Sequence, residues 1–175
     1  MLKEKIKYCF DYGKSAEKRF AEKHITNIVY SNKNQDIYEH WDVMGILKEI
    51  GSVSKFDVKT TKRLDHSSDP SVGIMESVWV EGKNVNGQDG WIRGNSDYIV
   101  FERENTWMVV NRVELLNLTL SKLKENNYKK GKGVYLVHTR YKRKDKVTKV
   151  LFKDIKTINH FELEKRVGLP LNQSI

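Results

Sequence analysis

The chain has 175 residues, of which 38% are hydrophobic and 31% are charged, so it fits one folded domain and is not an intrinsically disordered protein. Its formal net charge of +9 favours a polyanionic partner, because each phosphate that a basic side chain neutralises releases condensed counterions. Cys9 is the only cysteine, which excludes an intrachain disulfide and a cysteine-based zinc site.

The first residues contain no apolar run of the kind found in secretory signals, and no stretch approaches the length of a membrane span. We therefore expect a cytoplasmic protein without a membrane partner. The glycine-containing segments lack the lysine pattern of a phosphate-binding loop, so we expect no nucleotide cofactor.

The first half of the chain predicts a helix followed by two strands. Residues 15–26 have apolar side chains at helical spacing, and Ser15 is a suitable N-cap. Residues 41–47 and 53–61 are rich in residues typical of strands and are separated by a turn that contains Gly51. We expect these strands to be antiparallel neighbours, which would bring Asp42 within reach of Asp57. Residues 62–73 predict a loop.

The second half predicts more strands around one helix. Strands are expected at residues 76–83, 98–102, 106–111, 134–138 and 147–152, and an amphipathic helix at residues 112–126. The fold class is then α/β (α+β), with a central mixed, mostly antiparallel, twisted sheet flanked by helices. We expect a single domain over residues 1–175, with its core at about 15–126 and a basic C-terminal hairpin at about 129–165.

Asp57, Val58 and Lys59 form an acid-x-Lys motif in the second of these strands. Residues two apart on a strand share a face and lie about 7 Å apart, so the carboxylate and the ammonium point into one space. Mg²⁺ prefers oxygen ligands, which Asp42, Asp57 and the Val58 carbonyl can supply. Without a metal the two carboxylates would repel and one pKa would rise. The same motif also occurs on ordinary solvated strands.

Two further side chains complete this hypothesis. Lys59 would orient the attacking water or stabilise negative charge in the transition state of phosphodiester cleavage. Glu17 borders the buried face of the predicted helix, where it would hold a second metal or a water bound to the first.

In order and type, Glu17, Asp42 and Asp57-Val58-Lys59 resemble the PD-(D/E)XK nuclease superfamily, over roughly residues 15–126. The resemblance implies a restriction-endonuclease-like core and a Mg²⁺-dependent DNA endonuclease in which Mn²⁺ can substitute. It also implies a homodimer if both strands of a duplex are cut. Residues 78–91 and 94–102 are similar to a block in phage and bacterial proteins grouped with this superfamily, so a phage-encoded protein would act in the host cytoplasm.

The resemblance has two departures. Asp42 is not preceded by proline, and the chain contains a second motif, Glu81-Gly82-Lys83. If the second motif is the catalytic one, Asp57 becomes the upstream acid and Lys83 the catalytic lysine. We favour the first assignment because Gly82 weakens the end of its strand, whereas β-branched and aromatic residues surround Asp57. Glu81 is then an additional acid facing the same cleft.

Basic residues follow the predicted catalytic strand and also occupy the predicted C-terminal hairpin. We expect them to contact the DNA backbone. They are Lys62, Arg63, Lys130, Lys132, Arg140, Lys142, Arg143 and Lys144. A solvated charged surface is the alternative interpretation, and we favour DNA contact because the predicted acidic site lies elsewhere in the same chain. The alternative function is therefore a non-catalytic nucleic-acid-binding protein with the same fold, whose binding would be sensitive to salt and indifferent to Mg²⁺.

Overall fold

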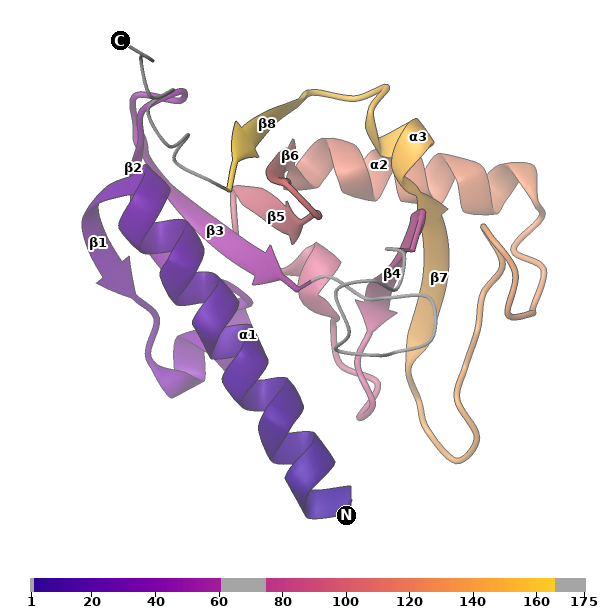
Figure 1. The fold of residues 1–175 in the computed structure, drawn as a ribbon. Coiled ribbons are helices and arrows are strands. Elements are labelled where there is room, and N and C mark those ends of the chain that lie inside the picture. Colours follow the sequence, from indigo (N-terminus) through magenta and orange to yellow (C-terminus); the bar gives the residue numbers. More distant parts are fainter. Residues whose placement is uncertain (1, 61–74, 166–175) are drawn as a thin grey trace, which may run out of the picture.

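The computed structural model describes residues 2–60 and 75–165, with side chains from residue 13 onward. The elements in chain order are α1 (Leu2–His24), β1 (Ile25–Tyr30), the π-helical turn η1 (Gln35–Glu39), β2 (Val43–Leu47), β3 (Val53–Lys59), β4 (Ser77–Lys83), the 3₁₀ turn η2 (Trp91–Arg93), β5 (Tyr98–Glu102), β6 (Thr106–Asn111), α2 (Arg112–Glu125), β7 (Lys146–Leu151), α3 (Phe152–Ile155) and β8 (His160–Glu164) (Figure 1).

Six strands form one sheet in the order β1-β2-β3-β5-β6-β8. Only the β3–β5 pair is parallel, and the other four pairs are antiparallel. Strands β4 and β7 form a separate antiparallel pair. The expected class, a mixed α/β fold with a mostly antiparallel sheet, is confirmed, although the two strands predicted at residues 76–83 and 147–152 form a second sheet.

Helix α1 crosses one face of the large sheet (Figure 1). Its fully buried Ala16 and Phe20 pack with Phe56 of β3 and Val100 of β5. The Phe20 ring meets the rings of Phe56 and Trp107 in edge-on contacts. The i, i+4 spacing of Ala16 and Phe20 explains this burial, because it places both residues on one side of the helix.

The opposite face of the large sheet is covered by α2 and by the β4–β7 pair (Figure 1). Ile99 and Phe101 of β5 belong to a second buried cluster that includes Leu115 of α2 and Val80 of β4. Strand β5 therefore buries both of its faces, which explains why its sequence is apolar almost without interruption.

Several predicted element boundaries were wrong. Helix α1 begins at Leu2 rather than at Ser15, because the preceding Lys- and Glu-rich residues are good helix formers. The segment predicted as a strand at residues 134–138 forms only isolated bridges, of which Val134–Lys149 and His138–Val147 join it to β7, and β4 is the strand that pairs with β7 along its length. Strand β1 was not predicted, although Ile25–Tyr30 is rich in β-branched residues.

The segment predicted as a loop at residues 62–73 lies outside the described residues, and so do Lys62 and Arg63. Within the described part of the chain, no helix combines the length and the apolar character needed to cross a membrane.

Candidate active site

Asp42 lies immediately before β2, at the point where this strand separates from β3. Its main-chain N–H donates to the Phe56 carbonyl at 2.8 Å, and its Oδ2 accepts a hydrogen bond from the Val58 N–H at 2.7 Å. The Asp42 carboxylate thus takes the place of the main-chain carbonyl that a paired strand would present to the Val58 N–H. Because the N–H and C=O of one strand residue point to the same side, the Val58 carbonyl faces this edge as well.

Asp57 and Lys59 point away from α1, since they alternate along β3 with Phe56 and Val58, which face that helix. The Asp57 side chain is 2% exposed. Lys59 Nζ donates to Asp57 Oδ1 at 2.5 Å and lies 5.1 Å from the ring centroid of Trp91. Among the described residues, the buried Oδ2 of Asp57 has no hydrogen-bond partner.

The electrostatics show that Asp42, Asp57 and Lys59 form one cluster. Burial raises the pKa of Asp57 strongly, the Lys59 charge opposes this rise, and the nearby charge of Asp42 adds to it. Burial alone would lower the pKa of Lys59, but the charges of Asp57 and Asp42 outweigh it and raise that pKa. Lys59 therefore remains a cation at neutral pH, and Asp57 resists ionisation.

Glu17 and Glu81 lie on opposite sides of this cluster. Burial and the charge of Asp42 raise the pKa of Glu17, while a hydrogen bond from Lys14 at 2.9 Å opposes the rise. Burial also raises the pKa of Glu81, and the Lys59 charge is the largest influence that lowers it. Each acid is thus electrostatically coupled to the cluster, Glu17 through Asp42 and Glu81 through Lys59.

Asp42 and Asp57 are the two buried carboxylates of this cluster that could hold a metal ion. Within residues 13–60 and 75–165, no group of three or more His, Cys, Asp or Glu side chains is arranged to hold a metal ion. Mg²⁺ in phosphate-processing sites commonly uses only one or two carboxylates and takes its remaining ligands from water and substrate. The unpartnered oxygen of Asp57, beside a second buried carboxylate, supplies the donor that such an ion requires.

Lys83, the lysine of the alternative motif, lies away from this cluster. Its Nζ donates to the Gly87 carbonyl at 3.3 Å and lies 3.7 Å from an oxygen of Asp89. Its strand, β4, belongs to the smaller sheet, whereas Asp57 lies in the larger one. The geometry thus favours the Asp57-Val58-Lys59 motif.

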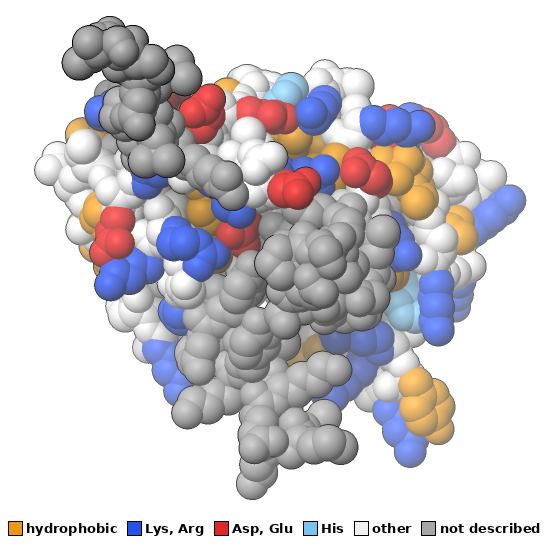
Figure 2. All heavy atoms as spheres, in the orientation of Figure 1, with side chains coloured by type: hydrophobic (Ala, Val, Ile, Leu, Met, Phe, Trp, Pro, Cys, Tyr) orange, Lys and Arg blue, Asp and Glu red, His pale blue; other side chains and the backbone are white. Residues whose placement is uncertain are grey.

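The basic residues of the C-terminal region are all exposed, namely Lys130, Lys132, Arg140, Lys142, Arg143 and Lys144. Figure 2 shows Lys and Arg side chains on the right-hand side of the molecule, where β7 and the segment before it lie. Arg140 lines a cavity together with Glu81, so it is the basic residue of this group that the structure brings toward the cluster.

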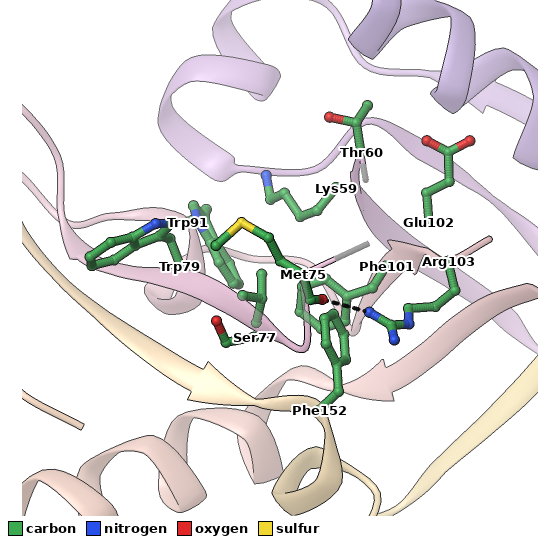
Figure 3. A pocket seen from close by; sticks show the side chains of 11 residues that line it. Lys59, Thr60, Met75, Ser77, Trp79, Trp91, Phe101, Glu102, Arg103 and Phe152 are labelled. Atoms are coloured by element: carbon green, nitrogen blue, oxygen red, sulfur yellow. Dashed lines mark hydrogen bonds between the residues drawn. The ribbon is translucent and has the colours of Figure 1, made fainter. Parts of the chain in front are cut away.

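Two tryptophans beside the cluster were not predicted as site residues. Trp79 and Trp91 both line a pocket of about 120 Å³ that Lys59 also lines (Figure 3). Trp91 belongs to the buried core at 9% exposure, as Trp41 and Trp107 do at 2% and 1%, whereas Trp79 is half-buried. Nothing in the local sequence identifies Trp79 as a residue of this pocket, because β4 is positioned by its long-range pairing with β7.

Comparison with known proteins adds no relative from which a role could be transferred: no protein-family model, no curated protein and no solved structure matches the chain.

Proposed function

We propose that this chain is a Mg²⁺-dependent DNA endonuclease of the PD-(D/E)XK type, built on a restriction-endonuclease-like core. One observation carries the proposal: two buried carboxylates, Asp42 and Asp57, adjoin a lysine, and Asp57 retains an unpartnered oxygen. Two like charges about 4 Å apart repel by about 4 kcal/mol at an effective dielectric constant of about 20.

Asp42, Asp57 and the Val58 carbonyl would hold the ion. Bound Mg²⁺ supplies Lewis acidity toward the scissile phosphate. The hydrogen bond from the Val58 N–H fixes Asp42, and the Lys59 ammonium fixes Asp57, so both acids are oriented before substrate arrives.

Among the side chains proposed for this site, only Lys59 carries a positive charge. With its pKa raised by the two acids, its ammonium can donate a hydrogen bond to the attacking water or to a phosphate oxygen as negative charge develops there. Glu17, coupled to Asp42 through its charge, supports the acid cluster from the α1 side, and Glu81 faces Lys59 from β4.

The exposed basic residues before β7 support DNA as the polyanionic substrate, because they can neutralise backbone phosphates. Cutting both strands of a duplex would require two such sites and thus a homodimer, whereas nicking would require only one. The alternative is a nucleic-acid-binding protein that uses the same basic surface without catalysis.

The test is nicking of supercoiled plasmid DNA in Mg²⁺ by the wild type and by Asp57→Asn and Lys59→Met. We expect each substitution to lower the nicking rate by about a hundredfold or more. Asp89→Asn and Lys83→Met are matched controls, because these two side chains are exposed partners away from the cluster. Both controls should nick at the wild-type rate.

Equal nicking by wild type and Asp57→Asn would contradict the proposal and indicate a contaminating nuclease. Loss of nicking in Lys83→Met but not in Lys59→Met would assign catalysis to the second motif. DNA binding that is unchanged by Mg²⁺, with no nicking, would support the non-catalytic alternative.

A further inference from the structure

A cavity of about 430 Å³ lies next to the candidate active site. Its walls are formed by Trp79, Glu81, Trp91, His138, Arg140 and Val147. Its volume lies in the range of small-molecule pockets and is ample for one nucleobase. Trp79 and Trp91 also line the smaller pocket that contains Lys59, so the two hollows share a wall of two indole rings (Figure 3).

We propose that this cavity binds one unpaired nucleotide of the substrate, so that the preferred DNA has a single-stranded or unstacked nucleotide beside the scissile phosphate. This inference rests on the proposed function for the position of the phosphate. It goes beyond that function by naming the form of DNA that the site receives.

The aromatic wall supplies a surface for base stacking. Trp91 is a core residue with 9% exposure that contributes one wall of the cavity, and Lys59 Nζ lies over its ring, 5.1 Å from the centroid. Trp79 is half-buried, its ring centroid lies 5.8 Å from that of His138, and Lys149 Nζ lies 5.1 Å from it. Indole faces bind every base, and cations beside them suit the phosphate that follows each base along the chain.

Arg140 is held in place at the rim of the cavity. Its main-chain N–H donates to Asp145 Oδ1 at 3.0 Å, and its Nε donates to Asp145 Oδ2. Asp145 is fully buried; burial opposes its ionisation, but the hydrogen bonds from Arg140 outweigh this and lower its pKa. Among the described residues, the terminal guanidinium nitrogens of Arg140 have no partner, so they can bind a phosphate without first being reoriented.

Glu81 gives the wall an acceptor. A carboxylate in such a position can accept a hydrogen bond from a base amino group, whose Watson–Crick edge is exposed only when the base is unpaired. A duplex presents its bases stacked and paired, so it could place none of them between Trp79, Glu81 and Arg140. The tryptophan rings therefore match the base of a single nucleotide, Glu81 matches the amino group of that base, and Arg140 matches the phosphate.

The experiment measures binding by fluorescence anisotropy in EDTA, so that it does not depend on catalysis. The probes are a fluorescein-labelled 12-nucleotide single strand of mixed sequence and the matching duplex. We expect the wild type to bind the single strand at least about tenfold more tightly than the duplex. Trp79→Ala should weaken single-strand binding by about tenfold to a hundredfold and leave duplex binding unchanged.

Trp79→Phe should recover part of the lost affinity, because phenylalanine still stacks. Tyr30→Ala is the matched control, since it removes a half-exposed aromatic ring from the edge strand β1 that does not line the cavity. A second measurement needs no variant: the single strand should quench the tryptophan emission of the wild type, because Trp79 and Trp91 line the cavity.

Equal affinity of wild type and Trp79→Ala for the single strand would overturn the inference, as would equal losses for single strand and duplex. Unquenched emission at saturating single strand would also overturn it. These outcomes are independent of plasmid nicking, because a protein without nuclease activity can still bind the single strand as expected. Failure of this inference and failure of the proposed function are therefore distinguishable.

Discussion

Asp42 serves the fold and the site at once, and two substitutions can separate these roles. Asp42→Ala leaves the buried Val58 N–H without an acceptor, so we expect it to lower the free energy of unfolding by about 1–3 kcal/mol. Asp42→Asn keeps an oxygen acceptor and removes a charge beside Asp57, so its loss should be smaller. Urea denaturation compares their stabilities, and plasmid nicking should be lost in both. Full nicking by Asp42→Asn would show that Asp42 is only structural.

Glu102 forms a second buried charge cluster, which we expect to be purely structural. Its side chain is 2% exposed and accepts hydrogen bonds from Arg19 at 2.8 Å and from Lys165 at 3.0 Å. Burial raises its pKa, but the two cations outweigh burial and lower it. Ionised Glu102 therefore stabilises the fold above the ordinary glutamate pKa of about 4.3, and this contribution disappears as the pH falls through the lowered value.

Glu102→Gln should accordingly lower the free energy of unfolding by about 1–3 kcal/mol at pH 7, and the difference from wild type should shrink below about pH 4. Urea denaturation at a series of pH values measures this. The exposed Glu104→Gln is the control and should match wild type throughout. A difference that persists unchanged to pH 3 would contradict the ionic explanation.

Some of the individual site residues can be predicted from the sequence, and other features of the site cannot. Two strands joined by a short turn place Asp42 beside Asp57, and the period of two places Lys59 on the same face as Asp57. Local patterns contain no information about the unpartnered oxygen of Asp57 or about the Arg140–Asp145 pair. Those features depend on burial and on distant contacts.

Among the elements, β4 determines the shape of the cavity, and its position depends on Gly90. A Cβ at Gly90 would lie 2.3 Å from the Glu81 carbonyl oxygen, whereas one at Gly82 would lie 3.7 Å from its nearest neighbour, the Lys146 carbonyl oxygen. Gly90→Ala should therefore lower the free energy of unfolding by about 1–3 kcal/mol and weaken single-strand binding by shifting Glu81 and Trp91.

Gly82→Ala, within β4 itself, should stay within about 0.5 kcal/mol of the wild-type stability and bind the single strand normally. Thermal or urea unfolding together with the anisotropy assay provides the comparison. If both alanines are tolerated equally, the close packing of Gly90 against Glu81 does not set the geometry of the cavity.

Elements with strong local patterns were predictable, and elements fixed by distant pairing were not. Strands β5 and β6 and helix α2 follow from apolar runs and helical periodicity, and their predicted bounds agree with the structure to within one residue. The parallel β3–β5 pair and the β4–β7 sheet join segments that other elements separate along the chain, so no local signal specifies them.

The net charge of +9 belongs to the whole molecule, but DNA binding should depend on only part of it. If the segment before β7 contacts phosphates, Lys142→Gln should reduce the slope of log affinity against log salt concentration by about 0.7–0.9. Lys18→Gln removes the same charge from an exposed position on α1 and should leave the slope unchanged. Anisotropy titrations between low and moderate salt measure both slopes. Identical slopes for the two variants would mean that binding depends on the net charge and not on a contact between Lys142 and a phosphate.

The most direct test of the central claim, that Asp42, Asp57 and Val58 surround one divalent ion beside Lys59, is a crystal of the protein soaked with Mn²⁺. We predict one anomalous peak in contact with oxygens of Asp42 and Asp57, at about the 2.1 Å typical of Mg²⁺ coordination. Lys59 should lie next to it without contacting the metal. A peak at other residues, or no peak at these two carboxylates at saturating Mn²⁺, would contradict the account.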